Sequence, residues 1–124
     1  MRLSARLPAA ALALAIAAAP SPTLAHAVVL ESTPAPDATV PAGNIDCRLK
    51  FNGRIDAARS RLSLIGPDGK ARALPQMAEN AVDRLSARAE GLTPGRWRIQ
   101  WQVLAADGHV TRGEIPFSVA PARP

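Results

Sequence analysis

A strict alternation of apolar and polar residues constrains the fold more than any other feature of this chain. The alternation is clearest at residues 97–103, which read WRIQWQV. Because successive side chains of an extended strand point to opposite faces, such a pattern predicts a strand with one buried face. Shorter stretches with the same period stand at residues 45–51, 62–64, 85–89 and 115–119. Helical spacing of apolar residues is hard to find, so the chain is expected to be all-β.

Turn-forming residues separate these stretches and set the number of strands. The sequence GPDG at residues 66–69 is a strong turn signal, and Gly91, Pro94 and Gly95 precede the clearest strand. With a further strand expected at residues 27–30, about seven short strands fit into roughly 100 residues. This count and spacing predict an immunoglobulin-like Greek-key β-sandwich of about seven antiparallel strands.

Two segments carry no clear strand pattern. Residues 33–41 (TPAPDATVP) are rich in proline and are expected to form a rigid connection. Residues 75–82 have no clear period, so we expect a loop or a short turn of helix there.

The beginning of the chain has the organisation of a secretory signal peptide. Two arginines precede the apolar run AAALALAIAAA at residues 9–19, and prolines and small residues follow it. The run is too short to span a bilayer, which requires about 20 apolar residues. We therefore expect residues 1–25 to be a signal peptide that is removed on export, and residues 26–124 to form one domain.

The position of the cleavage site decides which residue begins the mature chain. Thr23 and Ala25 would direct cleavage before His26. Ala25 and Ala27 would direct it two residues later, before Val28. Both sites fit the small-x-small rule, and the local pattern slightly favours the second, although only the first keeps His26 in the mature protein.

The composition excludes several kinds of function. A single cysteine, Cys47, rules out an internal disulfide and a cysteine-rich zinc site, and its place on the apolar face of a strand predicts a buried thiol. The net charge of +5 is spread along the chain without the basic stripe typical of nucleic-acid binding, so no nucleic-acid partner is expected. No Ser-His-acid or Cys-His motif with supporting context predicts a hydrolase.

Acid–base or metal chemistry is left to two histidines and a neighbouring aspartate. Asp107 and His109 stand in the sequence ADGH, shortly after the clearest strand. Because they are two positions apart, an extended segment would direct both side chains to one side. A carboxylate and an imidazole are ligands that Cu(II) or Zn(II) accepts, but a DGH sequence more often forms a polar turn.

His26 would complete a ligand set if the mature chain begins with it. A free α-amine has an ordinary pKa of about 8, against about 10.4 for a lysine amine, so a metal ion displaces its proton more easily. The α-amine and imidazole of His26, the imidazole of His109 and the carboxylate of Asp107 form a tetragonal N,N,N,O set, which Cu(II) prefers. The alternative is that His26 belongs merely to the cleavage region and His109 to a loop.

Three longer segments cover essentially the whole chain from His26 onward. They are HAVVLESTPAPDATV, LKFNGRI from Leu49 and PGRWRIQWQVLAADGHVTRGEIPFSV from Pro94. Together they resemble CopC-type periplasmic copper-resistance proteins, most specifically in the initial HA pair, the S-x-P-A-x-x-A-x-V run and the strand that leads into AADGH. The resemblance implies an immunoglobulin-like sandwich in the periplasm with one Cu(II) ion held by His26, Asp107 and His109. Members of the family begin with this histidine, which favours cleavage after Ala25.

The chain departs from the family pattern at two points. Some members carry a second, methionine-rich site for Cu(I), but Met77 is the only methionine after residue 25, so binding of Cu(II) alone is expected. Where the family commonly reads F-N/S-E-x-V, this chain has FNGRI at residues 51–55 and lacks the acidic residue. We expect the loss of this residue to alter the surroundings of the site or its contacts with a partner, and to leave the ligands in place.

The resemblance implies a copper carrier and not an enzyme. Such a protein would act as a monomer, bind one Cu(II) ion per chain and pass it to a CopD-like inner-membrane protein. Two alternatives stay open. An N-terminal histidine with a second histidine is also the histidine-brace arrangement of copper-dependent redox enzymes. A metal-free periplasmic interaction module would instead use its charged strand faces to dock a partner.

Overall fold

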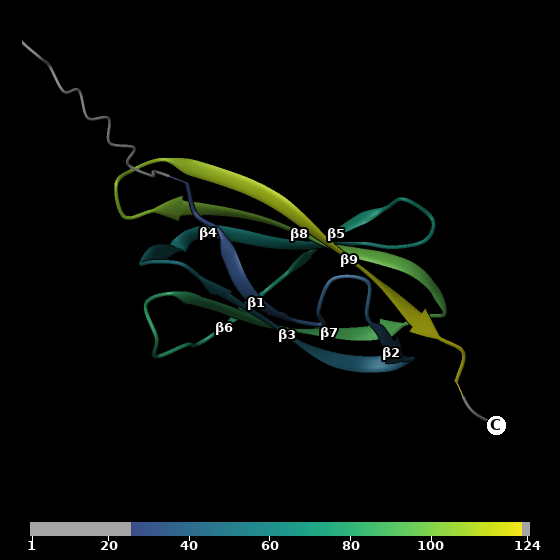
Figure 1. Cartoon of the computed structure of the whole chain (residues 1–124). Helices are drawn as coiled ribbons and strands as arrows, with labels where there is room; N and C mark the ends of the chain where they lie inside the picture. The colour runs from purple at the N-terminus through teal and green to yellow at the C-terminus, as the bar shows by residue number, and fades with distance from the viewer. Residues whose placement is uncertain (1–25, 123–124) are drawn as a thin grey trace, which may run out of the picture.

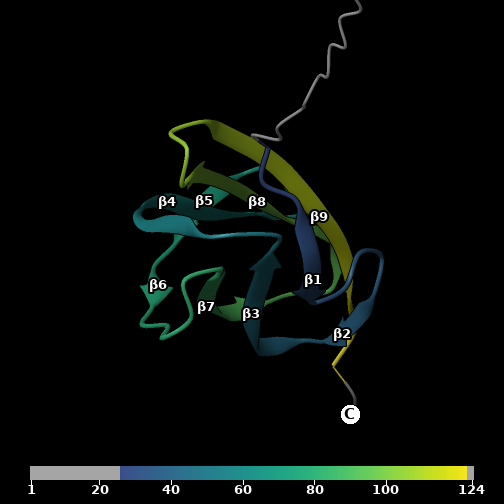
Figure 2. The same ribbon diagram turned by 60° about the vertical axis from the view of Figure 1, so that its left-hand side comes forward.

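The computed structural model describes residues 26–122, which form two packed β-sheets (Figure 1). Residues 1–25, the expected signal peptide, lie outside this range. The smaller sheet has the strand order β1 (Val29–Thr33), β3 (Gly43–Phe51), β7 (Arg84–Leu92) and β6 (Gln76–Met77). The larger sheet has the order β2 (Thr39–Pro41), β9 (Val110–Ala120), β8 (Gly95–Ala105), β4 (Ile55–Ile65) and β5 (Ala71–Leu74). The two layers are also seen after rotation of the molecule (Figure 2).

The strand pairing confirms the predicted all-β, immunoglobulin-like Greek-key sandwich. Neighbouring strands pair antiparallel, except that β2 runs parallel to β9. Residues 26–122 form nine strands, whereas the sequence predicted about seven, because its pattern does not reveal the short strands β2, β5 and β6. These strands have two to four residues each, too few for a period of two to stand out.

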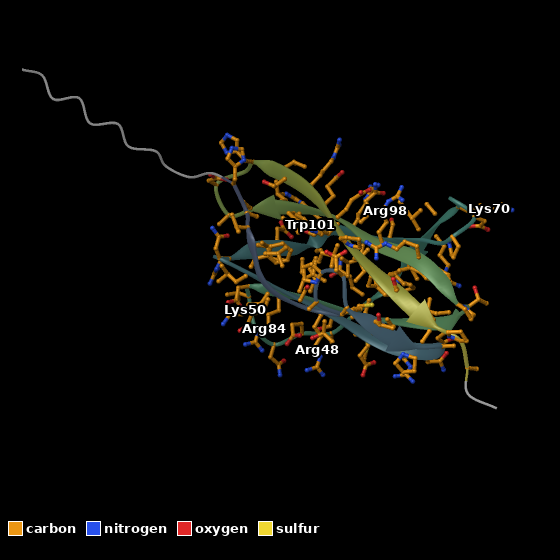
Figure 3. All side chains as sticks on the ribbon, turned by 45° about the vertical axis from the view of Figure 1, so that its right-hand side comes forward. Arg48, Lys50, Lys70, Arg84, Arg98 and Trp101 are labelled. Atoms are coloured by element: carbon orange, nitrogen blue, oxygen red, sulfur yellow. The ribbon has the colours of Figure 1, made fainter. Side chains whose placement is uncertain are left out.

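The hydrophobic core lies between the two sheets and follows the alternation seen in the sequence. In β8 the side chains of Trp97, Ile99, Trp101 and Val103 are buried, while the residues between them face outward. The largest fully buried side chains of the core are Phe51, Phe117, Leu49, Leu64, Leu85 and Ile99. The charged side chains of Arg48, Lys50 and Arg84 project from the outer face of the smaller sheet (Figure 3). One face of each long strand therefore supplies the core, as the period of two requires.

Two segments expected to lack strands each contain a short one. Residues 33–41, expected to be a rigid connection, end in β2. Residues 75–82, expected to be a loop or a turn of helix, contain the two-residue strand β6, which pairs with Ser86 and Ala87. The Gln76 side chain fixes this strand to the opposite sheet, since its Nε2 donates to the backbone oxygens of Ala57 (3.0 Å) and Ser60 (2.7 Å).

The first strand begins later than expected, at Val29 and not at Ala27. The backbone N–H groups of Ala27 and Val28 donate to side-chain oxygens and not to the backbone of a neighbouring strand. These two residues are thus held against the sandwich without belonging to a sheet.

Among residues 26–122, the structure has no helix with the length and hydropathy of a membrane span.

Four segments meet at one end of the sandwich. The start of the described chain lies beside the hairpin that joins β8 and β9 (Figures 1 and 2). The turn between β3 and β4 joins them, because Ala106 N–H donates to Arg54 O (3.2 Å) and Asn52 N–H donates to Val28 O (2.9 Å). The segment before β7 completes this end, since Ile55 N–H donates to Val82 O (3.0 Å).

Candidate metal-binding site

The β8–β9 hairpin positions Asp107 and His109 at this end of the sandwich. Gly108 N–H donates to Ala105 O (2.9 Å), and Ala105 N–H donates to His109 O (2.8 Å), so the loop is a tight turn that closes directly onto the strand pair. Gly108 has a φ of +92°, in the left-handed region that glycine adopts without a steric cost. The DGH sequence therefore forms the polar turn expected of it, and this turn also brings the two side chains together.

The carboxylate of Asp107 is in contact with His109 through both backbone and side chain. The His109 N–H donates to Asp107 Oδ1 (3.0 Å), and His109 Nδ1 lies 3.2 Å from the same oxygen. The backbone N–H is the largest cause of the lowered pKa of Asp107, and the His109 side chain adds to it. The carboxylate is therefore anionic at neutral pH and orients the imidazole beside it.

His26 lies at the start of the described chain, and its neighbour Ala27 is fixed in the structure. Ala27 is only 7% exposed and belongs to the core. Its N–H donates to Thr111 Oγ1 (3.3 Å), two residues after His109 along the chain. Consecutive Cα atoms are 3.8 Å apart, so His26 is held at the same end of the sandwich as the DGH turn.

The side chains of the three predicted ligands do not form one cluster. Within residues 26–122, no group of three or more His, Cys, Asp or Glu side chains is close enough to hold a metal ion. Asp107 and His109 are brought together, whereas His26 is exposed and does not complete a group of three with them. Binding of one ion by all three residues would therefore require a rearrangement of their side chains.

Two other residues considered in the sequence are separate from this site. Cys47 is fully buried in β3, as predicted, and burial together with the charge of Asp46 raises the pKa of its thiol to about 11. The thiol is thus protonated and chemically quiet at neutral pH. Met77 lies half exposed on β6, at the far edge of the smaller sheet from β1.

Sequence reasoning missed two residues that contact the N-terminal segment. Thr111 accepts the Ala27 N–H, and the Oδ1 of Asn52 accepts the Val28 N–H (3.0 Å). Thr111 carries a weak sequence signal, since it stands only two positions after His109. Asn52 carries none, because its role depends on how the N-terminal segment crosses the β3–β4 turn.

Comparison with known proteins gives the class to which this chain belongs. The family model described as CopC domain matches residues 29–120, so the chain belongs to the CopC domain family. Protein YobA of Escherichia coli strain K12 is 30% identical over 98 residues, which are 77% of this chain and 79% of YobA.

Two solved structures share the fold. CopC from Methylosinus trichosporium OB3b has a TM-score of 0.71 and 24% identity, over 80% of this chain and 98% of the other. PcoC, a methionine-rich copper resistance protein from Escherichia coli, has a TM-score of 0.62 and 21% identity, over 77% of this chain and 99% of the other. The sandwich described above is thus the one found in these two proteins.

Proposed function

We propose that this chain is a periplasmic Cu(II) carrier of copper resistance, with one ion bound per chain at the end formed by His26, Asp107 and His109. The observation that carries this proposal is the fixed position of Ala27, whose N–H bonds Thr111 in the strand that follows His109. This contact holds the residue before Ala27 near the DGH turn. Membership of the CopC family and the copper-related relatives support the choice of metal.

Each proposed ligand supplies a different part of the Cu(II) site. The imidazole of His109 and the carboxylate of Asp107 already lie side by side, with Nδ1 3.2 Å from Oδ1, so both groups can approach one ion. The anionic carboxylate also offsets part of the charge of the ion. When the chain begins at His26, its α-amine and imidazole provide two further nitrogen atoms, which suit a tetragonal Cu(II) ion.

The exposure of the site fits a protein that gives its metal away. The side chains of His109 and Asp107 are 64% and 46% exposed. A second protein could therefore reach the ion and replace the ligands one at a time. We include in the proposal that this acceptor is a CopD-like inner-membrane protein and that the carrier acts as a monomer.

The decisive experiment compares two chains that differ by one residue at the N-terminus. The first begins at His26, and the second carries one additional glycine, which turns the α-amine of His26 into an amide. Intact mass after export identifies the natural start, and electron paramagnetic resonance with Cu(II) titration measures ligation and stoichiometry. We expect one tightly bound Cu(II) in the first chain and much weaker binding in the second. Equal binding by the two chains, or a mature chain that begins after His26, would refute the proposed ligands.

The same samples separate the carrier from its alternatives. Sustained peroxide formation by the copper-loaded protein with ascorbate would indicate a redox enzyme with a histidine brace. Absence of Cu(II) binding by the chain that begins at His26 would indicate a metal-free interaction module. The carrier predicts stoichiometric binding with no sustained turnover.

A further inference from the structure

Two side chains outside the proposed ligand set hold the backbone that follows His26. Thr111, half buried near the start of β9, accepts the Ala27 N–H at 3.3 Å. Asn52, in the turn after β3, accepts the Val28 N–H through Oδ1 at 3.0 Å. The Asn52 backbone N–H in turn donates to Val28 O at 2.9 Å. The first residues of the described chain are thus bonded on one side to β9 and on the other to the β3–β4 turn.

The contact with Thr111 places the N-terminal segment near His109. His109 directly precedes β9, and its backbone oxygen accepts the Ala105 N–H at the base of the hairpin. Two residues of chain span at most about 7 Å, so the Cα atoms of His109 and Thr111 lie within that distance. The Ala27 amide therefore bonds to a side chain only two residues along the chain from His109. A metal ion that bridges His26 and His109 needs this placement.

Without these bonds the segment would lose its fixed position. Ala27 is almost fully buried, and its N–H would remain without a partner if the Thr111 hydroxyl were removed. The position of His26 relative to the DGH turn would then have to be fixed at the moment of metal binding, which costs conformational entropy. Fixing it in advance strengthens binding without any additional ligand.

We propose that Thr111, assisted by Asn52, is a positioning residue that holds the N-terminal segment so that His26 can meet His109 on one Cu(II) ion. This inference rests on the proposed copper function and extends it to residues that do not touch the metal. Thr111 contributes more than Asn52, because its bond is partly buried whereas that of Asn52 is exposed to competing water.

The test uses the chain that begins at His26 and four variants. Thr111→Val keeps the shape of the side chain and removes the hydroxyl, and Thr111→Ser restores a hydroxyl. Asn52→Ala removes one side-chain bond but keeps the backbone bond to Val28. Thr39→Val, in β2 at the other end of β9, is the matched control, since Thr39 pairs with Ser118 far from the turn.

Two measurements are made on each variant. Competition titration gives the Kd for Cu(II), and amide hydrogen exchange of Ala27 in the metal-free protein reports the bond itself. We expect Thr111→Val to weaken Cu(II) binding about two- to tenfold and to speed exchange at Ala27 by a similar factor. Thr111→Ser and Thr39→Val should stay within about twofold of the wild type, with Asn52→Ala between these and Thr111→Val.

The outcomes distinguish this inference from the proposed function. If the wild type binds Cu(II) and Thr111→Val binds it with the same Kd, the role of Thr111 is overturned and the copper function is left intact. A failure of Thr111→Ser to recover the Kd would also overturn it, because the effect would then not depend on the hydroxyl. If the wild-type chain binds no Cu(II), the proposed function itself fails. Thr111→Ala replaces Thr111→Val should the latter not fold.

Discussion

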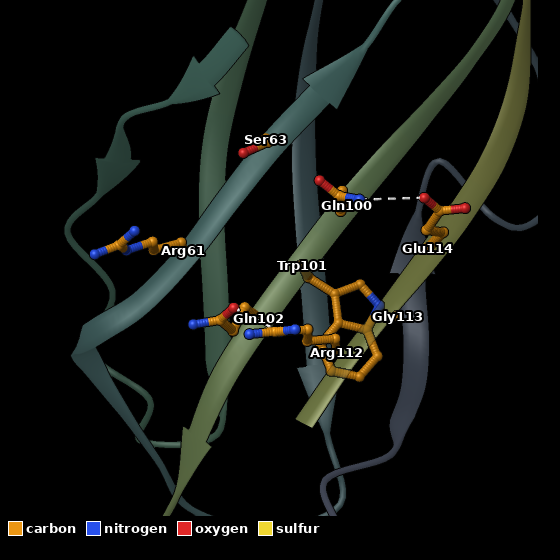
Figure 4. A pocket seen from close by; sticks show the side chains of 8 residues that line it. All are labelled: Arg61, Ser63, Gln100, Trp101, Gln102, Arg112, Gly113 and Glu114. Carbon is orange, nitrogen blue, oxygen red and sulfur yellow. Dashed lines mark hydrogen bonds between the residues drawn. The ribbon is translucent and has the colours of Figure 1, made fainter. Parts of the chain in front are cut away.

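Replacement of Gly113 by alanine tests how the core is closed beside the candidate site. Gly113 in β9 lies directly opposite Trp101 in β8, and the indole ring lies across it (Figure 4). A Cβ atom at Gly113 would lie 2.4 Å from Cζ2 and 2.6 Å from Cε2 of this ring. Normal contacts between carbon atoms are about 3.5–4.0 Å, so the ring would have to move by about 1 Å.

The expected cost follows from what surrounds the ring. Trp101 is only 7% exposed, and its ring centroid lies 5.3 Å from that of Phe51, in an edge-to-face contact between the two sheets. Overpacking costs about 1–3 kcal/mol, and loss of the aromatic contact costs about 0.5–1.5 kcal/mol. Reduced entropy of the unfolded chain returns about 0.4–1 kcal/mol. We therefore expect Gly113→Ala to lower the free energy of unfolding by about 2 kcal/mol.

Urea unfolding followed by far-ultraviolet circular dichroism measures this change. Gly53→Ala is the matched control, because a Cβ at Gly53 meets no atom within 4 Å and its φ is not in the left-handed region. This control should be neutral or slightly stabilising. Trp101→Leu should reduce the cost of Gly113→Ala in a double-mutant cycle. A change below about 0.5 kcal/mol for Gly113→Ala, or no coupling to Trp101, would refute the steric argument.

Three further predictions follow from other parts of the structure. The Cys47 thiol has a pKa of about 11 in the folded state and its ordinary pKa of 9.0 in the unfolded state, so its contribution to the free energy of unfolding should fall as pH rises from 9 to 11. Urea unfolding of Cys47→Ala should lack this loss. Equal pH profiles for the two proteins would contradict the prediction. Ser60→Ala should lower the free energy of unfolding by about 1–3 kcal/mol in the same assay, because Ser60 Oγ donates to Asp56 O (2.7 Å) and accepts from Leu104 N–H (3.1 Å). An unchanged free energy of unfolding would mean that water replaces both bonds. Asp107→Asn should weaken Cu(II) binding about tenfold and His109→Ala by more, as measured by competition titration; the reverse order would make the carboxylate the stronger ligand.

The long strands could be predicted from the sequence because their alternation reflects burial directly. The residues WRIQWQV lie within β8, and their apolar side chains are buried. In β4 the pattern was visible only at residues 62–64, although the strand begins at Ile55, because the register with β8 shifts between Asp56 and Arg61. Such an irregularity breaks the period of two, so a local pattern cannot detect the first half of the strand.

The candidate site was predictable only where it is local in sequence. Asp107 and His109 lie in one turn, and their contact follows from their spacing and from Gly108. The anchoring by Thr111 and Asn52 joins positions 84 and 24 residues apart from their partners, which no periodicity reports. The same holds for β2, whose parallel pairing with β9 depends on how the proline-rich segment returns across the sandwich.

The direction of β9 has a practical consequence for handling this protein. Its 11 residues run about 35 Å from the DGH turn to the opposite pole of the sandwich. A purification tag or a sensor surface attached beyond Ala120 would thus stand well away from the three proposed ligands. If the chain begins at His26 as proposed, an attachment ahead of this residue would block the terminal nitrogen. Immobilisation through the tail would leave the proposed copper site free.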